Sequence, residues 1–168
     1  MPNKSTPNNN PREISDLTFN EQVFIWALRM KVRGEHFFKK VVAHCEKNLP
    51  PAAARISLKS VEMVINSVRY HGKKSLTLNC TCMPRLSSDE LELITLYRSV
   101  NIEQNQINAS IASSMVTIEG TEMLVNALLS FHMAIETIDS PVPKQTDRLL
   151  VARQKQYEVC VPASKMIH

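Results

Sequence analysis

The chain has 168 residues, 43% of them hydrophobic, a formal net charge of +4 and only three glycines. A chain of this length buries roughly 70% of its unfolded surface in one core, so we predict a single domain. The scarcity of glycine excludes Gly-rich phosphate loops and turn-dense β folds. No apolar run approaches the ~18 residues that cross a bilayer, and the polar N-terminus lacks the apolar centre of a secretory signal. We expect a cytoplasmic protein without membrane association.

The charges are sorted along the chain. Residues 1–85 carry 14 cations against 6 anions, residues 86–139 carry 1 against 8, and residues 140–168 carry 5 against 2. A basic half joined to an acidic half is suited to binding a polyanion, to docking on a second copy, or to satisfying its charges within one fold. The absence of a base-reading set favours docking between the two halves, within or between subunits.

Both ends of the chain are expected to be poorly ordered. Residues 1–14 have almost no apolar content to offset the entropy of ordering, which predicts a disordered tail. Two prolines end the helical region, and we predict a weakly ordered basic tail over residues 140–168. Within it, 148–159 fits a short helix or an edge strand equally well.

Helical periodicity and end signals predict six helices. Thr18 and Glu21 form a capping box, and Ser87 and Glu90 form another, which mark two helix starts. Gly72 is expected in the left-handed conformation that often ends a helix. The predicted helices cover residues 19–33, 35–48, 52–71, 88–101, 105–116 and 121–138. A short alternating run near residues 75–79 is the one extended segment.

These elements predict an all-α fold, a single-domain bundle of about six helices with at most one short extended segment. The helical domain covers residues 15–139, with a basic layer at 17–74 and an acidic layer at 86–139. Its first and last helices are expected to supply most of the core. In the first helix, Arg29 is expected to lie near the C-terminal end, where a cation suits the helix dipole.

Four cysteines lie at positions 45, 80, 82 and 160, and without an export signal we expect them to be reduced. Cys80 and Cys82 offer two soft ligands to a metal ion, and His71 lies upstream as a third. Their spacing departs from that of structural zinc sites, and a disulfide that spans one residue is strained. The pattern therefore favours two ordinary cysteines over a metal or redox site.

No catalytic motif is present. The sequence lacks a nucleophile elbow, a P-loop, a dinucleotide fingerprint and a zinc-protease motif. His132 lies in the most apolar helix, where a histidine with a hydrogen-bond partner in the core or an interface is the simpler interpretation. The acidic residues Asp89, Glu90 and Glu92 are explained by the dipole of the helix they begin. We predict a non-enzymatic protein with no cofactor.

The basic half contains a candidate nucleic-acid surface. Its cations are Lys39, Lys40, Arg55, Lys59, Arg69, Lys73 and Lys74. Three of them recur at helical spacing, which suits contact with phosphates, but no polar set for reading base edges accompanies them. Aromatic residues make up 5% of the chain and supply no stacking platform for single strands. The simpler interpretation is a solvated basic face.

We favour a non-enzymatic regulatory or adaptor protein of bacterial type that acts through protein contacts, as a homodimer. The helix over 121–138 is more apolar than burial in a small bundle requires, which suggests an interface at Leu124, Leu128, Phe131 and Ile135. The first alternative is a DNA-binding transcriptional regulator that uses the basic surface of residues 35–74. The second is a metal or small-ligand sensor that uses Cys80 and Cys82.

Overall fold

The computed structural model describes residues 11–100, 105–136 and 165–167. Over these residues, a 3₁₀ turn at Ile14–Asp16 precedes six α-helices and two short strands. The helices are α1 (Phe19–Arg33), α2 (Glu35–Asn48), α3 (Pro51–His71), α4 (Ser88–Val100), α5 (Asn105–Met115) and α6 (Ile118–Glu136). The strands β1 (Leu76–Leu78) and β2 (Lys165–Ile167) pair antiparallel. The predicted all-α helical bundle is confirmed.

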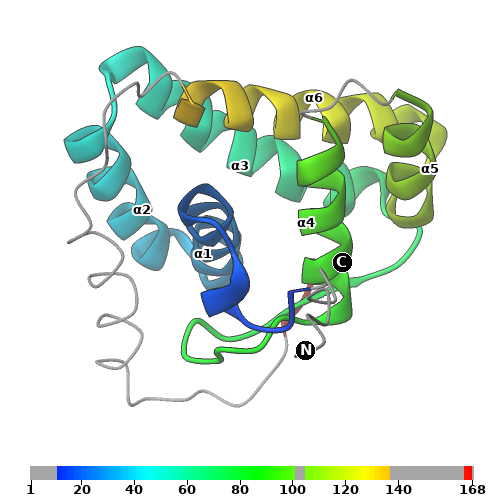
Figure 1. Ribbon diagram of the computed structural model, residues 1–168, viewed down its shortest axis with the longest axis horizontal. Coiled ribbons are helices and arrows are strands. Elements are labelled where there is room, and N and C mark those ends of the chain that lie inside the picture. Colours follow the sequence, from blue (N-terminus) through cyan, green and yellow to red (C-terminus); the bar gives the residue numbers. More distant parts are fainter. Residues whose placement is uncertain (1–10, 101–104, 137–164, 168) are drawn as a thin grey trace, which may run out of the picture.

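The two oppositely charged parts of the sequence each form a group of three helices. Helices α1, α2 and α3 contact one another, as do α4, α5 and α6. The most extensive packing between the two groups is that of α3 against α6. Figure 1 shows α3 and α6 side by side and running in opposite directions, with α1 between α2 and α4 beneath them. The change of charge along the sequence therefore coincides with a structural boundary.

Both predicted capping boxes are present. The Thr18 hydroxyl accepts from the amide of Glu21 at 3.4 Å, and the Glu21 carboxylate accepts from the amide of Thr18 at 2.8 Å. At α4, the amide of Glu90 donates to Ser87 at 3.1 Å and the amide of Ser87 donates to Glu90 at 2.8 Å. These reciprocal bonds satisfy amides that the first helical turn leaves without partners.

The structure corrects the predicted conformation of Gly72. This residue ends α3 with φ −65° and ψ 132°, outside the left-handed region. A steric restriction explains why glycine occupies this position, because a Cβ here would lie 2.3 Å from the carbonyl oxygen of Val68. Gly72 is also bridged to Val116 at the end of α5. The left-handed region is instead occupied by Gly34, with φ 129°, between α1 and α2.

The ordered structure begins before residue 15, although a disordered tail is expected over residues 1–14. The side chain of Ile14 is buried, and its amide donates to the carbonyl of Pro84 at 2.8 Å. The amide of Leu86 donates in turn to the carbonyl of Arg12 at 3.0 Å. Residues 11–14 therefore belong to the fold, whereas residues 1–10 lie outside the described part.

The predicted extended segment forms β1, whose partner is β2 at the end of the chain. Leu76 pairs with Ile167 and Leu78 pairs with Lys165. The sequence offers no obvious partner for β1 in the first half of the chain, and it predicts weak order for the region that contains β2. The rest of that region, including the segment 148–159, lies outside the described residues.

The core is shared more widely than predicted: α3 and α4 contribute buried hydrophobic side chains alongside α1 and α6, so the first and last helices do not supply most of it. Its largest fully buried side chains include Phe24, Ile25 and Leu28 of α1, Leu124, Leu128 and Phe131 of α6, and Leu93, Ile94 and Leu96 of α4. Helix α1 is buried on nearly every side because it lies between its neighbours (Figure 1). No helix in the described ranges is long and apolar enough to span a membrane.

The interface predicted on the sixth helix is corrected by this core. Leu124, Leu128, Phe131 and Ile135 are at most 5% exposed within one copy of the chain. Side chains that one protomer already buries have no surface to offer a second copy. The residues of α6 available to a partner lie on its other face.

Candidate functional site

The corner where α3 ends fixes the position of α5 and α6. The amide of Lys73 donates to the carbonyl of Met115 at 2.9 Å, and the amide of Thr117 donates to the carbonyl of His71 at 2.7 Å. Gly120 of α6 lies against His71, where a Cβ at position 120 would meet the Cβ of His71 at 2.4 Å. These contacts hold the turn between α5 and α6 against the end of α3.

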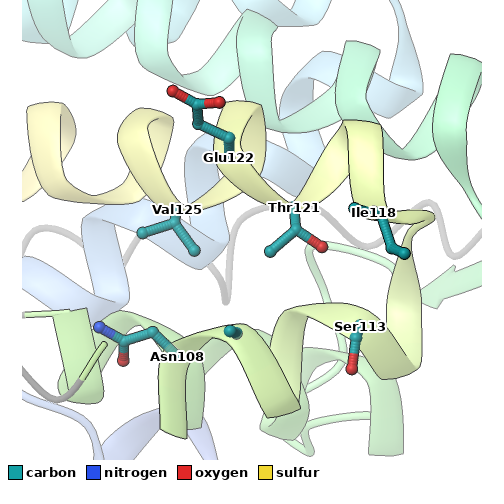
Figure 2. A pocket seen from close by; sticks show the side chains of 7 residues that line it. Asn108, Ser113, Ile118, Thr121, Glu122 and Val125 are labelled. Carbon is teal, nitrogen blue, oxygen red and sulfur yellow. The ribbon is translucent and has the colours of Figure 1, made fainter. Parts of the chain in front are cut away.

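A groove lies between α5 and α6, with a cavity volume of about 340 Å³. The groove residues are Asn108, Ala109 and Ser113 of α5 and Ile118, Thr121, Glu122 and Val125 of α6. Figure 2 shows Val125 and Thr121 extending from α6 towards the side chains of α5. The groove is therefore an open, mostly apolar channel between the two helices.

An exposed apolar stripe continues this groove along α6. Ile118 is 83% exposed, Leu129 36% and Met133 59%, and Val125 is half-buried between them. Steps of seven, four and four residues place all four on one side of the helix over about 22 Å. Contiguous exposed apolar surface of this kind commonly marks an interaction site.

Asn108 adds a polar group to the groove. The residue is only 4% exposed, and its Oδ1 has no hydrogen-bond partner among the described residues. An acceptor buried without a partner costs about 1–3 kcal/mol, so it is an uncommon feature in a native protein.

The two helices that form the groove carry charge of one sign, and one cation from outside them, Lys73, reaches its edge, where its Nζ donates to the carbonyl of Ser113 at 2.8 Å. Residues 105–136 contain Glu119, Glu122 and Glu136 and no lysine or arginine. Glu122 lines the groove itself, and Glu119 and Glu136 are exposed near the two ends of α6. The groove thus combines apolar side chains with an acidic rim.

The predicted metal ligands are only partly brought together. Cys80 and Cys82 are adjacent, with 2.9 Å between their sulfur atoms. His71 lies instead at the corner of α3 and α6, beside Gly120. Among the residues that the structure describes, no group of three or more His, Cys, Asp or Glu side chains is arranged to hold a metal ion.

The predicted nucleic-acid surface is interrupted by acidic partners. Lys74 pairs with Asp89 at 2.9 Å and with Glu92 at 3.0 Å. On the exposed face of α3, Glu62 lies between Lys59 and Arg69 in sequence and pairs with Lys59 at 3.9 Å. The remaining predicted cations divide by exposure: Lys39, Arg55, Arg69 and Lys73 are exposed, and Lys40 is half-buried. Nucleic-acid binding by this surface stays a prediction.

His132 lies in the core beside Tyr97. Its Nδ1 is 3.3 Å from the Tyr97 hydroxyl, and its Nε2 is 3.0 Å from Glu136 Oε2. Burial, together with the charges of Glu21 and Glu136, raises the pKa of Tyr97 well above its usual value. The surroundings fit the expected core histidine, because both ring nitrogens lie near polar groups.

The sequence indicated the helices of the groove but missed its residues. The sequence contains a stripe of apolar residues at helical spacing, formed by Ile118, Val125, Leu129 and Met133. The opposite face of the same helix is equally apolar, so periodicity alone does not tell which face is buried. Only the packing of α3 and α4 against α6 determines which face is buried.

The chain matches no family model, no curated protein and no solved structure.

Proposed function

We propose that the protein is a non-enzymatic adaptor that binds a basic amphipathic helix of a partner protein in the groove between α5 and α6. The observation that carries the proposal is the exposed stripe of Ile118, Val125, Leu129 and Met133 beside a groove with an acidic rim. Binding of an amphipathic helix in such a groove uses anchors three or four residues apart. The stripe of α6 follows the same helical period, with steps of seven, four and four residues.

The sign of the charge selects the partner. A second copy that used the same face would bring Glu119, Glu122 and Glu136 of each copy close to those of the other, with no cation from residues 105–136 between them. Like charges placed together across an interface oppose association. A helix with lysine or arginine beside its apolar face relieves this repulsion, and for this reason we place a basic partner in the groove rather than a homodimer.

The experiment uses two synthetic helical peptides with the same leucine pattern, one carrying lysines and the other glutamates. Binding to the full chain is measured by fluorescence anisotropy, and the contact surface is mapped by NMR chemical shifts. We expect the basic peptide to bind at least tenfold more tightly than the acidic one and to shift resonances of α5 and α6. Its affinity is expected to fall with added salt because the rim charges are screened.

Substitutions on the stripe locate the site. Ile118→Ser and Met133→Ser remove exposed apolar groups, which should weaken the basic peptide by fivefold or more and leave the fold intact. Ile56→Ser is the matched control, because Ile56 is 47% exposed on α3, away from the groove. Equal binding of both peptides, or equal loss in the control, would contradict the proposal. If the protein forms a stable dimer that Met133→Ser dissociates, the occupant of the groove is a second copy of the chain and the proposal of a basic partner helix is wrong.

A further inference from the structure

Cys80 and Cys82 lie in a loop whose backbone is held by one buried side chain. The guanidinium of Arg29 donates to the carbonyls of Cys80 at 3.1 Å, Met83 at 2.8 Å and Arg85 at 3.0 Å. The amide of Asn79, just before the loop, donates to Glu90 at 3.1 Å. The loop is thus fixed at both ends and in the middle, and its two thiols meet without further ordering of the chain.

The two thiols are arranged for reaction with each other. Cys82 donates a hydrogen bond to the sulfur of Cys80 over 2.9 Å, and both side chains are partly exposed. Arg33 lies beside them and donates to the Thr81 hydroxyl at 3.3 Å. A dithiol near a cation and within reach of solvent is the usual setting of a reactive cysteine, in contrast to a buried structural one.

The electrostatics distinguish Cys80 from Cys45. Burial of Cys80 opposes ionisation, but the hydrogen bonds from Cys82 and the charge of Arg33 outweigh it and hold the pKa of Cys80 below its usual value. For Cys45, burial and the charge of Glu46 raise the pKa to about 11. Cys80 is therefore the more nucleophilic of these two thiols, and Cys45 serves as an internal unreactive reference.

We propose that Cys80 and Cys82 form a redox-active dithiol that exchanges with small-molecule or protein disulfides and closes to a reversible disulfide within the loop. The Cys80 thiolate attacks one sulfur of a disulfide RSSR, the S–S bond breaks, and one RS⁻ leaves. The Cys82 thiolate then attacks the Cys80 sulfur of the mixed disulfide and releases the second RS⁻. Two electrons and two protons pass from the dithiol to RSSR, which becomes two RSH.

The short spacing makes the closed form easy to reverse. A disulfide between residues two apart departs from relaxed geometry and stores strain, and strained disulfides have more oxidising potentials than structural ones. Such bonds are typical of regulatory and exchange sites, because a modest excess of reductant opens them. The strain of a bridge between such close cysteines, which in the sequence argued against a redox site, thus favours a reversible bond over a structural one.

The test follows the two cysteines in a single peptide. The full chain is equilibrated with mixtures of reduced and oxidised glutathione, quenched with acid, alkylated and digested with trypsin. Cleavage after Lys74 and Arg85 releases residues 75–85, which contain Cys80 and Cys82 and no other cysteine. We expect this peptide to lose two hydrogen atoms and both alkylation sites when oxidised glutathione is in excess, and dithiothreitol to restore them.

Variants assign the order of the steps. Cys82→Ser should accumulate a glutathione adduct on Cys80, whereas Cys80→Ser should react with glutathione disulfide at least tenfold more slowly. Arg33→Gln should move the pH midpoint of Cys80 alkylation upwards, and Lys47→Gln, which removes a cation from the far end of α2, should not. A Cys160→Ser background removes the cysteine that the structure does not describe, and circular dichroism confirms that each variant folds.

Two results would overturn the inference. One is a peptide 75–85 that stays fully reduced at every glutathione ratio while added thioredoxin, as a control dithiol, is oxidised. The other is oxidation that joins Cys80 or Cys82 to Cys45 or Cys160, which peptide mapping of the unmodified chain would reveal. Neither result bears on the groove between α5 and α6, so the two proposals fail independently.

Discussion

Arg29 and Glu90 form a buried ion pair with two hydrogen bonds, from Nε to Oε1 at 2.7 Å and from Nη2 to Oε2 at 2.9 Å. The pair joins α1 of the basic half to α4 of the acidic half, and Arg29 also organises the loop that contains Cys80 and Cys82. A cation expected to lie near the end of α1 and a carboxylate expected to cap its own helix and complement its dipole are thus one structural unit. Part of the charge sorting in the sequence is satisfied inside the fold.

Arg29→Met should destabilise the protein by about 3–5 kcal/mol, because it leaves the Glu90 carboxylate buried without its cation. Urea denaturation measures the loss. The double variant Arg29→Met with Glu90→Leu should be less destabilised than the sum of the two single changes. Lys59→Met is the control, because Lys59 forms an exposed pair with Glu62 that contributes at most about 1 kcal/mol. Similar losses in Arg29→Met and the control would contradict the assigned role of the pair.

Glu21→Gln should change how stability depends on pH. Burial opposes ionisation of Glu21, but hydrogen bonds from Arg98 and Thr18 outweigh it and hold the pKa of Glu21 below its usual value. A carboxylate with a lowered pKa in the folded state stabilises the fold above its unfolded pKa and loses this contribution as pH falls through the folded value. Wild type should therefore be more stable than Glu21→Gln at neutral pH.

The difference between wild type and Glu21→Gln should shrink as pH falls below the unfolded pKa of about 4.3. Thermal melts at intervals from acid to neutral pH measure it. Glu46→Gln removes an exposed carboxylate of α2 and serves as the matched control. A constant difference between wild type and Glu21→Gln across the pH range would refute the linkage.

Gly120→Ala should destabilise the contact of α3 with α6 by about 1–3 kcal/mol, the usual cost of overpacking. The added Cβ would lie 2.4 Å from the Cβ of His71 and 3.1 Å from that of Val116, so one helix must move. Thermal melts measure the loss. Asn126→Ala on the exposed face of α6 is the control and should stabilise slightly, because alanine favours helix. Equal melting temperatures for the two variants would argue against the close approach.

Asn108→Leu should separate stability from binding. Replacing a buried amide whose Oδ1 has no partner by an apolar side chain of similar size removes a cost of about 1–3 kcal/mol, so the melting temperature should rise. The same change removes the polar group of the groove, so the basic peptide should bind more weakly. Ser110→Ala, exposed on the same helix and outside the groove, is the control for binding. A variant that is both less stable and fully active in binding would contradict this assignment.

The sequence was most informative about local structure. Thr18 with Glu21 and Ser87 with Glu90 fix two helix starts through bonds between near neighbours, and these bonds form as predicted. Helix α2 has the predicted limits, and α4 begins at the predicted residue. Helix ends of this kind depend on residues within one turn, so a reader of the sequence has all the information that decides them.

The candidate site was much less accessible from the sequence. The apolar pattern of the sixth helix predicts an interface at residues that prove to be buried, such as Leu128, and not at exposed ones, such as Met133. Both faces have helical spacing, and their separation depends on contacts with α3 and α4, which are distant in sequence. The strand partner of β1 was missed for the same reason, since β2 lies near the other end of the chain.

By itself, the sequence determined the helical class, the positions of the helices and the boundary between basic and acidic halves. These follow from periodicity, capping and composition, which act over a few residues. The tertiary structure decided which face of α6 remains exposed, that Arg29 is buried against Glu90, and that Cys80 and Cys82 meet in a fixed loop. Burial and charge pairing arise from contacts between residues far apart in the chain, and only the folded arrangement determines them.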